Sequence, residues 1–553
     1  MRLAASFFGS RASLGTRAPT GEKPRLFGTG GRTSPLPGTG RPMLRLGAAP
    51  RRSASRNSAG TARPISRLGA VMRTLPVLMP LLAGACAGPQ DQGGAANPPI
   101  SNEAASQPEP RNVILFVGDG MGVSTVTAAR ILAGQLAGGK GEEYSLSFER
   151  FPHVALVKTY NTDMQVSDSA GTMTAMITGE KTRAGVLSVG ASVQRGNCAS
   201  GRENRLTTLL EQAEAAGYAT GLVSTATITH ATPGAAYAHA PERAWEHDAA
   251  MPAEALAAGC VDIARQLVEF PGGDGVDVML GGGRAHFLPG ERQDPEYPEA
   301  VGLRADGRDL TAEWLQGNSN RDYVWNRSQF EALAPSAQRQ VLGLFEPSHM
   351  QFEADRLASG EQEPSLAAMT AFAIESLAGN EKGFLLIAEG GRIDHAHHVT
   401  NAYRALTDTI ALDAAVSAAL RATDPANTLI LVTADHSHTF TISGYPRRGN
   451  PILGKVESAP GELALDANEL PYTTLGYANG PGYRDEPRDL TGVDTEAPDF
   501  QQVAAVNLPY ETHAGEDVAA YANGLGAAEL GGVIEQNEIY RVLYHALFGS
   551  RSD

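Results

Sequence analysis

Five short runs of apolar, β-forming residues constrain the fold of this chain more than any other feature. They occupy residues 113–117, 221–223, 276–280, 384–388 and 429–432. Because nearly every position in these runs is apolar, each predicted strand must be buried on both faces, as in a parallel sheet covered by helices. Apolar residues at helical spacing lie between the runs, at 205–216 and 366–378. This alternation predicts an α/β fold, a three-layer α/β/α sandwich around a central, mainly parallel sheet.

Residues 441–505 interrupt the alternation with Gly, Pro and Tyr, as at 444–446 and 480–483. We expect this segment to be an irregular insertion that lacks a core of its own. The chain has 553 residues, of which 42% are hydrophobic, so wholesale disorder is excluded and a large core is possible. We therefore predict one α/β domain over about 111–549, with the insertion at about 441–505.

The charge balance and the length of the apolar runs argue against two classes of protein. The chain has 45 Lys and Arg against 61 Asp and Glu, a net charge of −16, whereas a nucleic-acid backbone requires a basic surface. No apolar run reaches the ~18 residues of a membrane-spanning helix. We expect a globular protein without a nucleic-acid partner.

The N-terminal segment differs in composition from the rest of the chain. Residues 1–71 contain 12 Arg and one Lys against the single acid Glu22, and one interpretation is a disordered arm that binds nucleic acid or a membrane surface. However, Arg73 precedes an apolar stretch at 74–82 and small residues at 83–85, which predicts a signal peptide at 72–85. Since a signal peptide begins a chain, we interpret residues 1–71 as an over-extended N-terminus.

Cleavage after Ala85 would make Cys86 the first residue of an exported protein. Residues 83–86 also fit a bacterial lipoprotein site, although Ala83 stands where that pattern usually has Leu. We expect Cys86 to carry a lipid anchor, residues 86–110 to form a Pro-rich tether, and the mature protein to be periplasmic or at the cell surface. The two remaining cysteines, Cys198 and Cys260, can close one bridge in an oxidising compartment.

Metal-binding types of side chain occur where three of the predicted strands end. Asp119 follows the first run, Glu389 follows the run at 384–388, and Asp435 and His436 follow the last. A lone Asp after a strand is usually part of a turn or a helix cap. Ligands gather at the carboxyl ends of strands in open α/β sheets, so three such ends together indicate a metal site.

A second group of ligands is predicted on a helix. Asp394 and His398 are four residues apart and therefore lie on one helical face. A carboxylate and an imidazole form a zinc-type pair that needs a third ligand, for which His513 is the candidate. The alternative is a histidine-rich surface exposed to water, and we expect this for His397.

Ser169 is the candidate nucleophile. Small residues follow it at helical spacing, so it is expected where a helix begins, near unpaired N–H groups that favour an anion. The alternative is an ordinary helix cap formed by Asp168 and Ser169. The chain has no Gly-x-Ser-x-Gly motif, so this serine would be activated by a metal rather than by a triad histidine.

These motifs resemble those of the alkaline phosphatases. Segments 118–122, 168–172, 389–395, 433–438 and 512–517 occur in the order of that family, and 260–264, 281–284 and 323–327 match its animal-type branch. The resemblance covers about 110–547. It implies a hydrolase of phosphate monoesters that acts through a phosphoserine, commonly as a homodimer, with 441–505 as a crown-like insertion.

The resemblance also implies two Zn²⁺ ions and one Mg²⁺ ion. The first zinc would be held by Asp394, His398 and His513, and the second by Asp119, Asp435, His436 and Ser169. The magnesium would be held by Asp119, Glu389 and Thr232, which stands where animal enzymes usually have Ser. Arg243 matches the arginine that clamps phosphate, and the residues expected around the metals are Asp168, His230 and His395.

Two structural features are implied in the same way. One is a disulfide between Cys198 and Cys260. The other is a Ca²⁺ site made by Glu296, the backbone carbonyl of Phe345, Glu346 and Glu363. Glu363 stands where the family usually has Asp, and the alternative is that these carboxylates are solvated surface acids.

Particular residues argue against three rival functions. Sulfatases share the architecture but need a Cys-x-Pro-x-Arg signature, which neither Cys198 nor Cys260 provides. Nucleotide pyrophosphatases normally lack the third metal set, so Thr232 and Glu389 favour a monoesterase. A surface lipoprotein that only stores metal or binds phosphate would not need Ser169 together with Arg243, and turnover of p-nitrophenyl phosphate separates it from an enzyme.

Overall fold

The computed structural model describes residues 110–360 and 362–549. Residues 1–109 lie outside the described residues. They include the predicted over-extended N-terminus at 1–71, the signal peptide at 72–85, Cys86 and the tether up to residue 109. Within the described ranges, no helix is both long enough and apolar enough to span a bilayer.

A single ten-stranded sheet organises the described chain, and its strands follow the order β17-β2-β16-β8-β1-β7-β3-β4-β6-β5. β16 runs antiparallel to both of its neighbours, whereas the other neighbouring pairs are parallel. The predicted α/β fold with a mainly parallel sheet is confirmed. The strands are β1 (Asn112–Gly118), β2 (His153–Lys158), β3 (Ala219–Thr227), β4 (Val278–Gly282), β5 (Arg321–Val324), β6 (Gln340–Leu344), β7 (Phe384–Gly390), β8 (Thr428–Ala434), β16 (Val518–Gly524) and β17 (Gly532–Glu535).

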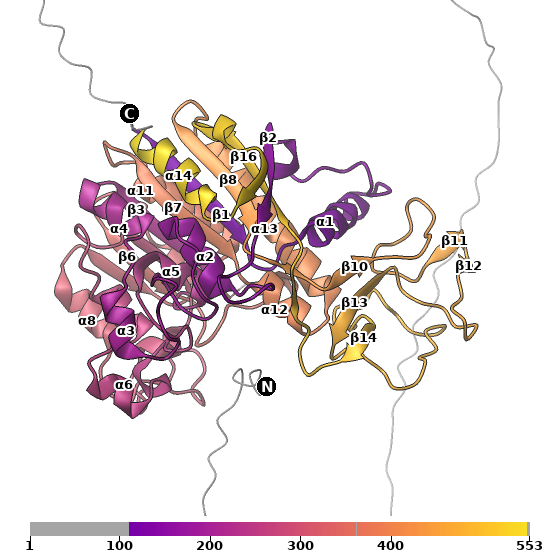
Figure 1. Ribbon diagram of the computed structural model, residues 1–553, viewed down its shortest axis with the longest axis horizontal. Coiled ribbons are helices and arrows are strands. Elements are labelled where there is room, and N and C mark those ends of the chain that lie inside the picture. The colour runs from indigo at the N-terminus through magenta and orange to yellow at the C-terminus, as the bar shows by residue number, and fades with distance from the viewer. Residues whose placement is uncertain (1–109, 361, 550–553) are drawn as a thin grey trace, which may run out of the picture. The chain divides into compact units, whose positions relative to one another are not determined.

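Two groups of helices pack against the central strands (Figure 1). The first group is α1 (Val123–Leu136), α11 (Leu366–Leu377) and α13 (Ala402–Ala422), and the second is α2 (Ser169–Thr178), α4 (Leu209–Ala216), α5 (Ala231–Tyr237) and α14 (Glu538–Phe548). The central strands are buried on both faces, as their continuous apolar runs require. The shorter helices are α3 (Cys198–Glu203), α6 (Ala253–Ala257), α7 (Ile263–Val268), α8 (Leu310–Gly317), α9 (Arg327–Glu331), α10 (Glu353–Ala358) and α12 (Arg392–His398).

Helix α4 begins four residues later than the predicted start at residue 205. The reason is a capping box: the Thr208 hydroxyl accepts the Glu211 N–H, and the Glu211 carboxylate accepts the Thr208 N–H. These two bonds satisfy donors that would otherwise be free at the first turn. Local capping chemistry therefore places this helix start more precisely than apolar periodicity does.

The inserted region, residues 441–505, continues from the end of β8 and adds little regular structure. Its short strands are β10 (Phe440–Ile442), β11 (Glu457–Ala459), β12 (Glu462–Leu463), β13 (Leu475–Gly480) and β14 (Ala504–Asn507). β13 lies between β10 and β14, and β11 pairs with β12. Its buried side chains, such as Leu475 and Tyr477, belong to the same apolar core as the main sheet. Helix α12 lies where this region meets the sheet (Figure 1).

Cys198 and Cys260 form a disulfide with their Cα atoms 5.7 Å apart. The bridge joins the first residue of α3 to the segment that follows α6. It packs in a small apolar cluster with Trp245 and Met251, separate from the main core. The disulfide therefore ties together a part of the chain that has little core of its own.

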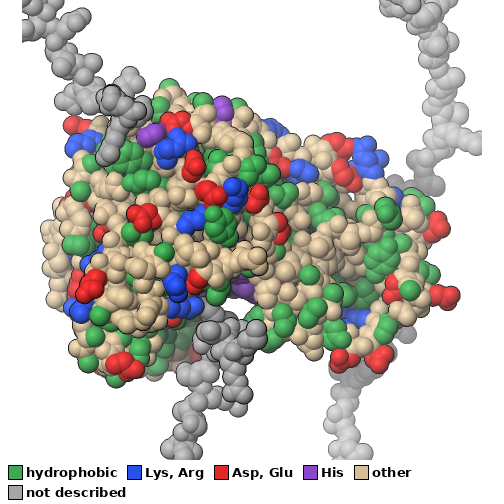
Figure 2. All heavy atoms as spheres, in the orientation of Figure 1, with side chains coloured by type: hydrophobic (Ala, Val, Ile, Leu, Met, Phe, Trp, Pro, Cys, Tyr) green, Lys and Arg blue, Asp and Glu red, His purple; other side chains and the backbone are tan. Residues whose placement is uncertain are grey.

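Acidic and basic side chains are interspersed on the face of the molecule shown in Figure 2. A phosphate backbone lying on this face would meet both signs of charge, rather than the basic surface that nucleic-acid binding requires.

Candidate functional site

Three carboxylates meet at the carboxyl edge of four neighbouring strands, β8, β1, β7 and β3. The parallel register places Gly118 at the end of β1 beside Gly390 of β7 and Ala434 of β8. Asp119 directly follows β1 and Asp435 directly follows β8, while Glu389 is the next-to-last residue of β7. All three carboxylates are buried.

Burial and mutual repulsion disfavour the charged form of these three carboxylates. Burial raises the pKa of Asp119 well above its usual range, and repulsion from Asp435 raises it further. Burial also raises the pKa of Glu389 to about 7. Asp119 Oδ2 has no hydrogen-bond partner among the described residues. Because buried charges need a partner, this donor set fits bound cations.

Helix α12 and the segment after the inserted region bring together the first predicted zinc ligands. Asp394 Oδ2 lies 3.2 Å from His398 Nε2, and Asp394 Oδ1 lies 3.3 Å from His513 Nε2. The two Nε2 atoms are 3.3 Å apart. One carboxylate and two imidazoles therefore converge on one point, as a zinc site with an open position requires.

Backbone carbonyls determine which nitrogen of each imidazole faces that point. His398 Nδ1 donates to the Glu511 carbonyl at 2.6 Å, and His513 Nδ1 donates to the Ser167 carbonyl at 2.8 Å. A carbonyl can only accept, so each Nδ1 carries a hydrogen, and each Nε2 faces the other Nε2 and the Asp394 carboxylate. Such carbonyl-oriented histidines are typical of metal ligands.

The second predicted zinc group surrounds the candidate nucleophile. His436 Nε2 lies 3.2 Å from Asp435 Oδ2, 3.5 Å from Asp119 Oδ1 and 3.2 Å from Ser169 Oγ. Ser169 Oγ is also 3.3 Å from Asp119 Oδ1. The serine hydroxyl therefore lies among two carboxylates and an imidazole, where a bound metal would contact it directly.

Gly120 allows this close packing. Its N–H donates to Asp435 Oδ1 at 2.9 Å, which orients that carboxylate. Its φ of +67° lies in the left-handed region, and a Cβ on it would lie 2.3 Å from His438 Nε2. Any larger residue would clash with that imidazole as well as strain the backbone.

The third predicted group consists of Asp119, Glu389 and Thr232, and the imidazole of His230 lies beside its two carboxylates. Thr232 lies in the first turn of α5, and its buried hydroxyl has no hydrogen-bond partner among the described residues. Ser224 Oγ donates to Glu389 Oε2. Asp119, shared with the second group, provides a further carboxylate. The carboxylate and hydroxyl oxygens of the three predicted ligands match the preference of Mg²⁺.

Ser169 is the first residue of α2, and Asp168 caps that helix. Asp168 Oδ1 accepts the Gly171 N–H at 3.1 Å, while Asp168 Oδ2 accepts the Gly185 N–H at 2.9 Å and Arg243 Nη1 at 3.1 Å. Burial acts to raise the pKa of Asp168, but Arg243 and the backbone N–H groups bring it below its ordinary value. Arg243 Nη2 donates to His230 Nε2 at 3.1 Å. The guanidinium is therefore held in place beside the serine.

Comparison with known proteins identifies the family. A family model described as alkaline phosphatase matches residues 110–548. The chain belongs to the alkaline phosphatase family. It is thus a hydrolase of phosphate monoesters in a metal-dependent family, and the resemblance stated from the sequence motifs is confirmed.

Curated relatives agree with this assignment. The tissue-nonspecific alkaline phosphatase of Gallus gallus is 48% identical over 79% of this chain and 84% of its own length. An alkaline phosphatase of Gadus morhua is 43% identical over 81% of this chain and 94% of its own length. Among solved structures, the Thermus thermophilus alkaline phosphatase has a TM-score of 0.57 at 24% identity, covering 82% of this chain and 96% of that one. This structural likeness supports the fold.

Two residues of this alkaline phosphatase, His438 and Glu511, support the first metal group but received no role from the sequence. His438 Nε2 lies 2.8 Å from Asp394 Oδ1, and His438 Nδ1 lies 2.5 Å from Glu511 Oε2. Burial acts to lower the pKa of His438, but the charge of Glu511 and the hydrogen bonds to both carboxylates raise it to about 10. The sequence signal was available, because His438 is two residues beyond His436 in the same motif.

The prediction that His397 is a solvated surface residue is wrong. Its side chain is 0% exposed. His397 Nε2 lies 3.0 Å from the Thr125 hydroxyl of α1, and its Nδ1 lies 2.8 Å from the Tyr477 hydroxyl of β13. The reason is that α12 is covered on this side by α1 and the inserted region, which helical periodicity alone cannot show.

The two predicted neighbours of the metal site, His230 and His395, lie in a cluster of imidazoles. Their rings are 5.4 Å apart, and His349, which the sequence did not suggest, lies 4.2 Å from His395. His349 Nδ1 accepts the Thr227 N–H at 3.1 Å. His349 therefore holds the loop between β3 and α5 that carries His230.

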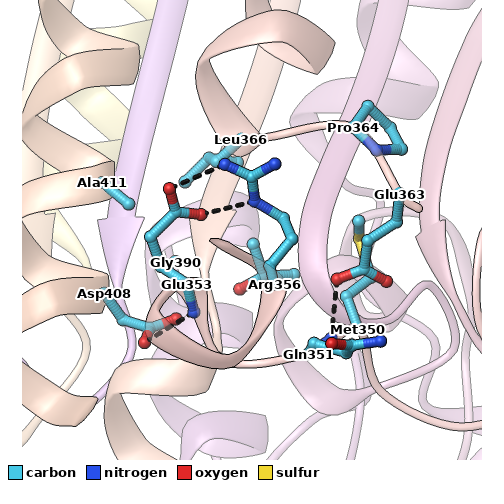
Figure 3. A pocket seen from close by; sticks show the side chains of 11 residues that line it. Met350, Gln351, Glu353, Arg356, Glu363, Pro364, Leu366, Gly390, Asp408 and Ala411 are labelled. Carbon is cyan, nitrogen blue, oxygen red and sulfur yellow. Dashed lines mark hydrogen bonds and ion pairs between the residues drawn. The ribbon is translucent and has the colours of Figure 1, made fainter. Parts of the chain in front are cut away.

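The acids of the predicted calcium site are brought near one another, although Glu296 has another partner. Glu296 Oε2 accepts Arg284 Nη2 at 3.0 Å. Tyr297 Oη donates to Glu346 at 3.0 Å, and Phe345 beside it is buried. The Glu363 carboxylate accepts the Gln351 N–H at 2.8 Å (Figure 3).

Glu363 is not a solvated surface acid. It is 2% exposed, and its Oε2 has no hydrogen-bond partner among the described residues. Burial, followed by repulsion from Glu346, raises the pKa of Glu363 to about 8. A buried carboxylate beside another carboxylate is an environment that a bound cation would stabilise.

Proposed function

We propose that this alkaline phosphatase cleaves phosphate monoesters through a phosphoserine on Ser169, at a site that holds two Zn²⁺ ions and one Mg²⁺ ion. The observation that carries this proposal is the convergence of His398 Nε2 and His513 Nε2, 3.3 Å apart, on the Asp394 carboxylate. Nitrogen-containing ligand sets at the first two groups suit Zn²⁺, and the oxygen set at the third suits Mg²⁺.

The chain's own residues would perform the following steps. Arg243 binds two oxygens of the phosphate with its planar guanidinium, and the N-terminus of α2 adds favourable N–H groups. The Ser169 oxygen then attacks phosphorus, the ester oxygen leaves as the alcohol, and hydrolysis of the phosphoserine restores the serine. The metals supply positive charge that lowers the pKa of the attacking hydroxyl and stabilises the leaving oxygen.

The test is a Ser169→Ala variant. We expect it to lose turnover of p-nitrophenyl phosphate and the phosphoenzyme that is trapped with labelled phosphate at acid pH, while its metal content stays unchanged. Ser376→Ala is the matched control, because Ser376 is also a buried serine but lies on α11. Retention of a labelled phosphoenzyme in Ser169→Ala would disprove the proposed nucleophile.

The calcium site is a further part of this proposal. The closeness of Glu346 and Glu363, and the buried free oxygen of Glu363, support a Ca²⁺ ion shared by separate loops with Glu296 and the Phe345 carbonyl. We expect Ca²⁺ to raise the unfolding temperature at fixed Zn²⁺ and Mg²⁺ without changing turnover. Glu346→Gln should abolish the increase, whereas Glu375→Gln, on the exposed face of α11, should keep it. An unchanged transition in the wild type would exclude the site.

Export and assembly complete the proposal. Residues 72–86 support cleavage after Ala85, with Cys86 lipidated, and residues 1–71 would then not be part of the natural product. Mass spectrometry of the protein from its native host tests this, and an N-terminus upstream of Met72 would contradict it.

We expect a homodimer, which light scattering of the purified enzyme would detect.

A further inference from the structure

The inserted region contacts the first zinc group through one strand, β13. Tyr477 and Asn479 are two residues apart on this strand and therefore share one face. Tyr477 Oη lies 2.8 Å from His397 Nδ1. Asn479 Oδ1 accepts the Thr512 N–H at 2.9 Å, and its Nδ2 donates to the Thr512 hydroxyl at 2.9 Å. Each contact thus ends on a residue adjacent in sequence to a predicted zinc ligand, His398 or His513.

The Tyr477 contact determines how His397 packs. Both ring nitrogens of His397 have hydroxyl partners, because Thr125 lies 3.0 Å from the other nitrogen. The His397 ring stacks on His438 with 4.8 Å between centroids, and His438 contacts Asp394 at 2.8 Å. Tyr477 is itself 4% exposed, with its ring against Phe440. His438 also meets the ring of His398 edge-on, with 5.0 Å between centroids. A chain of contacts therefore runs from β13 to Asp394 and His398.

The Asn479 contact supports the third ligand. Both bonds from Asn479 go to Thr512, which directly precedes His513. At the end of β13, a Cβ added to Gly480 would lie 2.9 Å from Glu511 Cβ, so strand and segment are in close contact. The backbone carbonyl of Glu511 also accepts a hydrogen bond from the ring Nδ1 of His398. Displacement of this segment would therefore move both imidazoles.

We propose that β13 of the inserted region positions the ligands of the first zinc site, with Tyr477 acting through His397 and Asn479 acting through Thr512. This inference rests on the proposed function, since it takes Asp394, His398 and His513 as zinc ligands. The other two metal groups take their ligands from α2, β7, α5 and the loops after β1 and β8, rather than from the segments that Tyr477 and Asn479 contact. Loss of either contact should thus weaken one zinc site selectively.

The experiment measures zinc release from the holoenzyme. Purified wild type, Tyr477→Phe and Asn479→Ala are mixed with a chromophoric chelator, and metal content is determined before and after. We expect one zinc per chain to leave each variant about tenfold faster than from the wild type, because residues that orient metal ligands affect affinity by roughly this factor. Release of the second zinc and of magnesium should be unchanged, and added Zn²⁺ should restore kcat.

Tyr472→Phe is the matched control, because Tyr472 lies in the same region but packs beside Gly444. It should release zinc as the wild type does. Unchanged zinc release in Tyr477→Phe and Asn479→Ala would overturn this inference and leave the proposed function standing. The same holds for a lowered unfolding temperature with normal zinc release. A wild-type enzyme that is active without zinc would overturn the proposed function and this inference together.

Discussion

Two nitrogens of the Arg243 guanidinium already form hydrogen bonds within the site. Nη1 donates to Asp168 and Nη2 to His230, so the guanidinium plane has one orientation. The shape of this cation therefore matters as much as its charge, because an ammonium cannot form two parallel bonds to a phosphate.

We expect Arg243→Lys to lower kcat/KM for p-nitrophenyl phosphate by about ten- to a hundredfold, the effect of losing one bidentate charge-assisted contact. The inhibition constant for inorganic phosphate should rise in parallel. Arg195→Lys is the control, since Arg195 is an exposed arginine paired with Glu242. An unchanged phosphate inhibition constant in Arg243→Lys would show that this residue does not bind the phosphate.

Glu214 is a buried acid on α4, far in sequence from the metal ligands. It is 2% exposed, and burial raises its pKa from 4.5 to about 8, with further repulsion from Asp277 and Asp274. The folded state therefore keeps a proton that the unfolded state loses. The resulting stability is complete below about pH 4.5 and is lost as the pH rises to about 8.

Glu214→Gln should remove this pH dependence, because an amide does not ionise. Between pH 5 and pH 9, the free energy of unfolding of the variant should fall less than that of the wild type, by a few kcal/mol. Denaturant unfolding at both pH values measures the difference. Glu203→Gln, an exposed residue at the end of α3, is the control. Parallel pH profiles for wild type and Glu214→Gln would contradict the prediction.

Among the secondary-structure elements, α4 shows how a helix end is coupled to the metal site. The Thr208 hydroxyl accepts the Glu211 N–H and donates to the Ala236 carbonyl of α5 at 2.7 Å. Helix α5 carries Thr232, a predicted magnesium ligand. One hydroxyl thus caps one helix and holds the next.

We expect Thr208→Ala to lower the free energy of unfolding by about 1 kcal/mol, the usual effect of losing an N-cap. The neighbouring exposed threonine provides the control variant Thr207→Ala, which should be neutral. Chemical denaturation of both variants measures the difference. Equal stability of the two variants would mean that the capping box does not contribute.

At the scale of the whole molecule, the disulfide holds a region outside the main core. Cys198 and Cys260 are separated by 62 residues, and the cluster around them is small. In the chain-entropy model, cross-linking a loop of this length lowers the entropy of the unfolded chain and so raises the free energy of unfolding by roughly 4 kcal/mol.

The double variant Cys198→Ser, Cys260→Ser should lose stability by about that amount, and reductant should lower the unfolding temperature of the wild type only. Calorimetry with and without reductant measures both effects. Two alkylatable thiols at these positions in the native protein would contradict the prediction.

Much of the fold could be predicted because it depends on local patterns. Continuous apolar runs such as 113–117 indicate strands buried on both faces, and parallel strands place Asp119, Glu389 and Asp435 at one edge. The helix on which Asp394 and His398 share a face could be predicted for the same reason. These inferences need only periodicity and the direction of the strands.

The surroundings of the ligands depended on contacts between distant segments. His397 was expected in water because nothing in α12 indicates what packs against it, and it is Tyr477, 80 residues away, that covers it. Glu511 reaches His438 across 73 residues. The amino-acid sequence by itself determined the sheet, the residue types of the metal groups and the family. Only the tertiary structure decided which side chains orient those ligands, because burial and hydrogen bonding depend on what folds against a residue rather than on the residue itself.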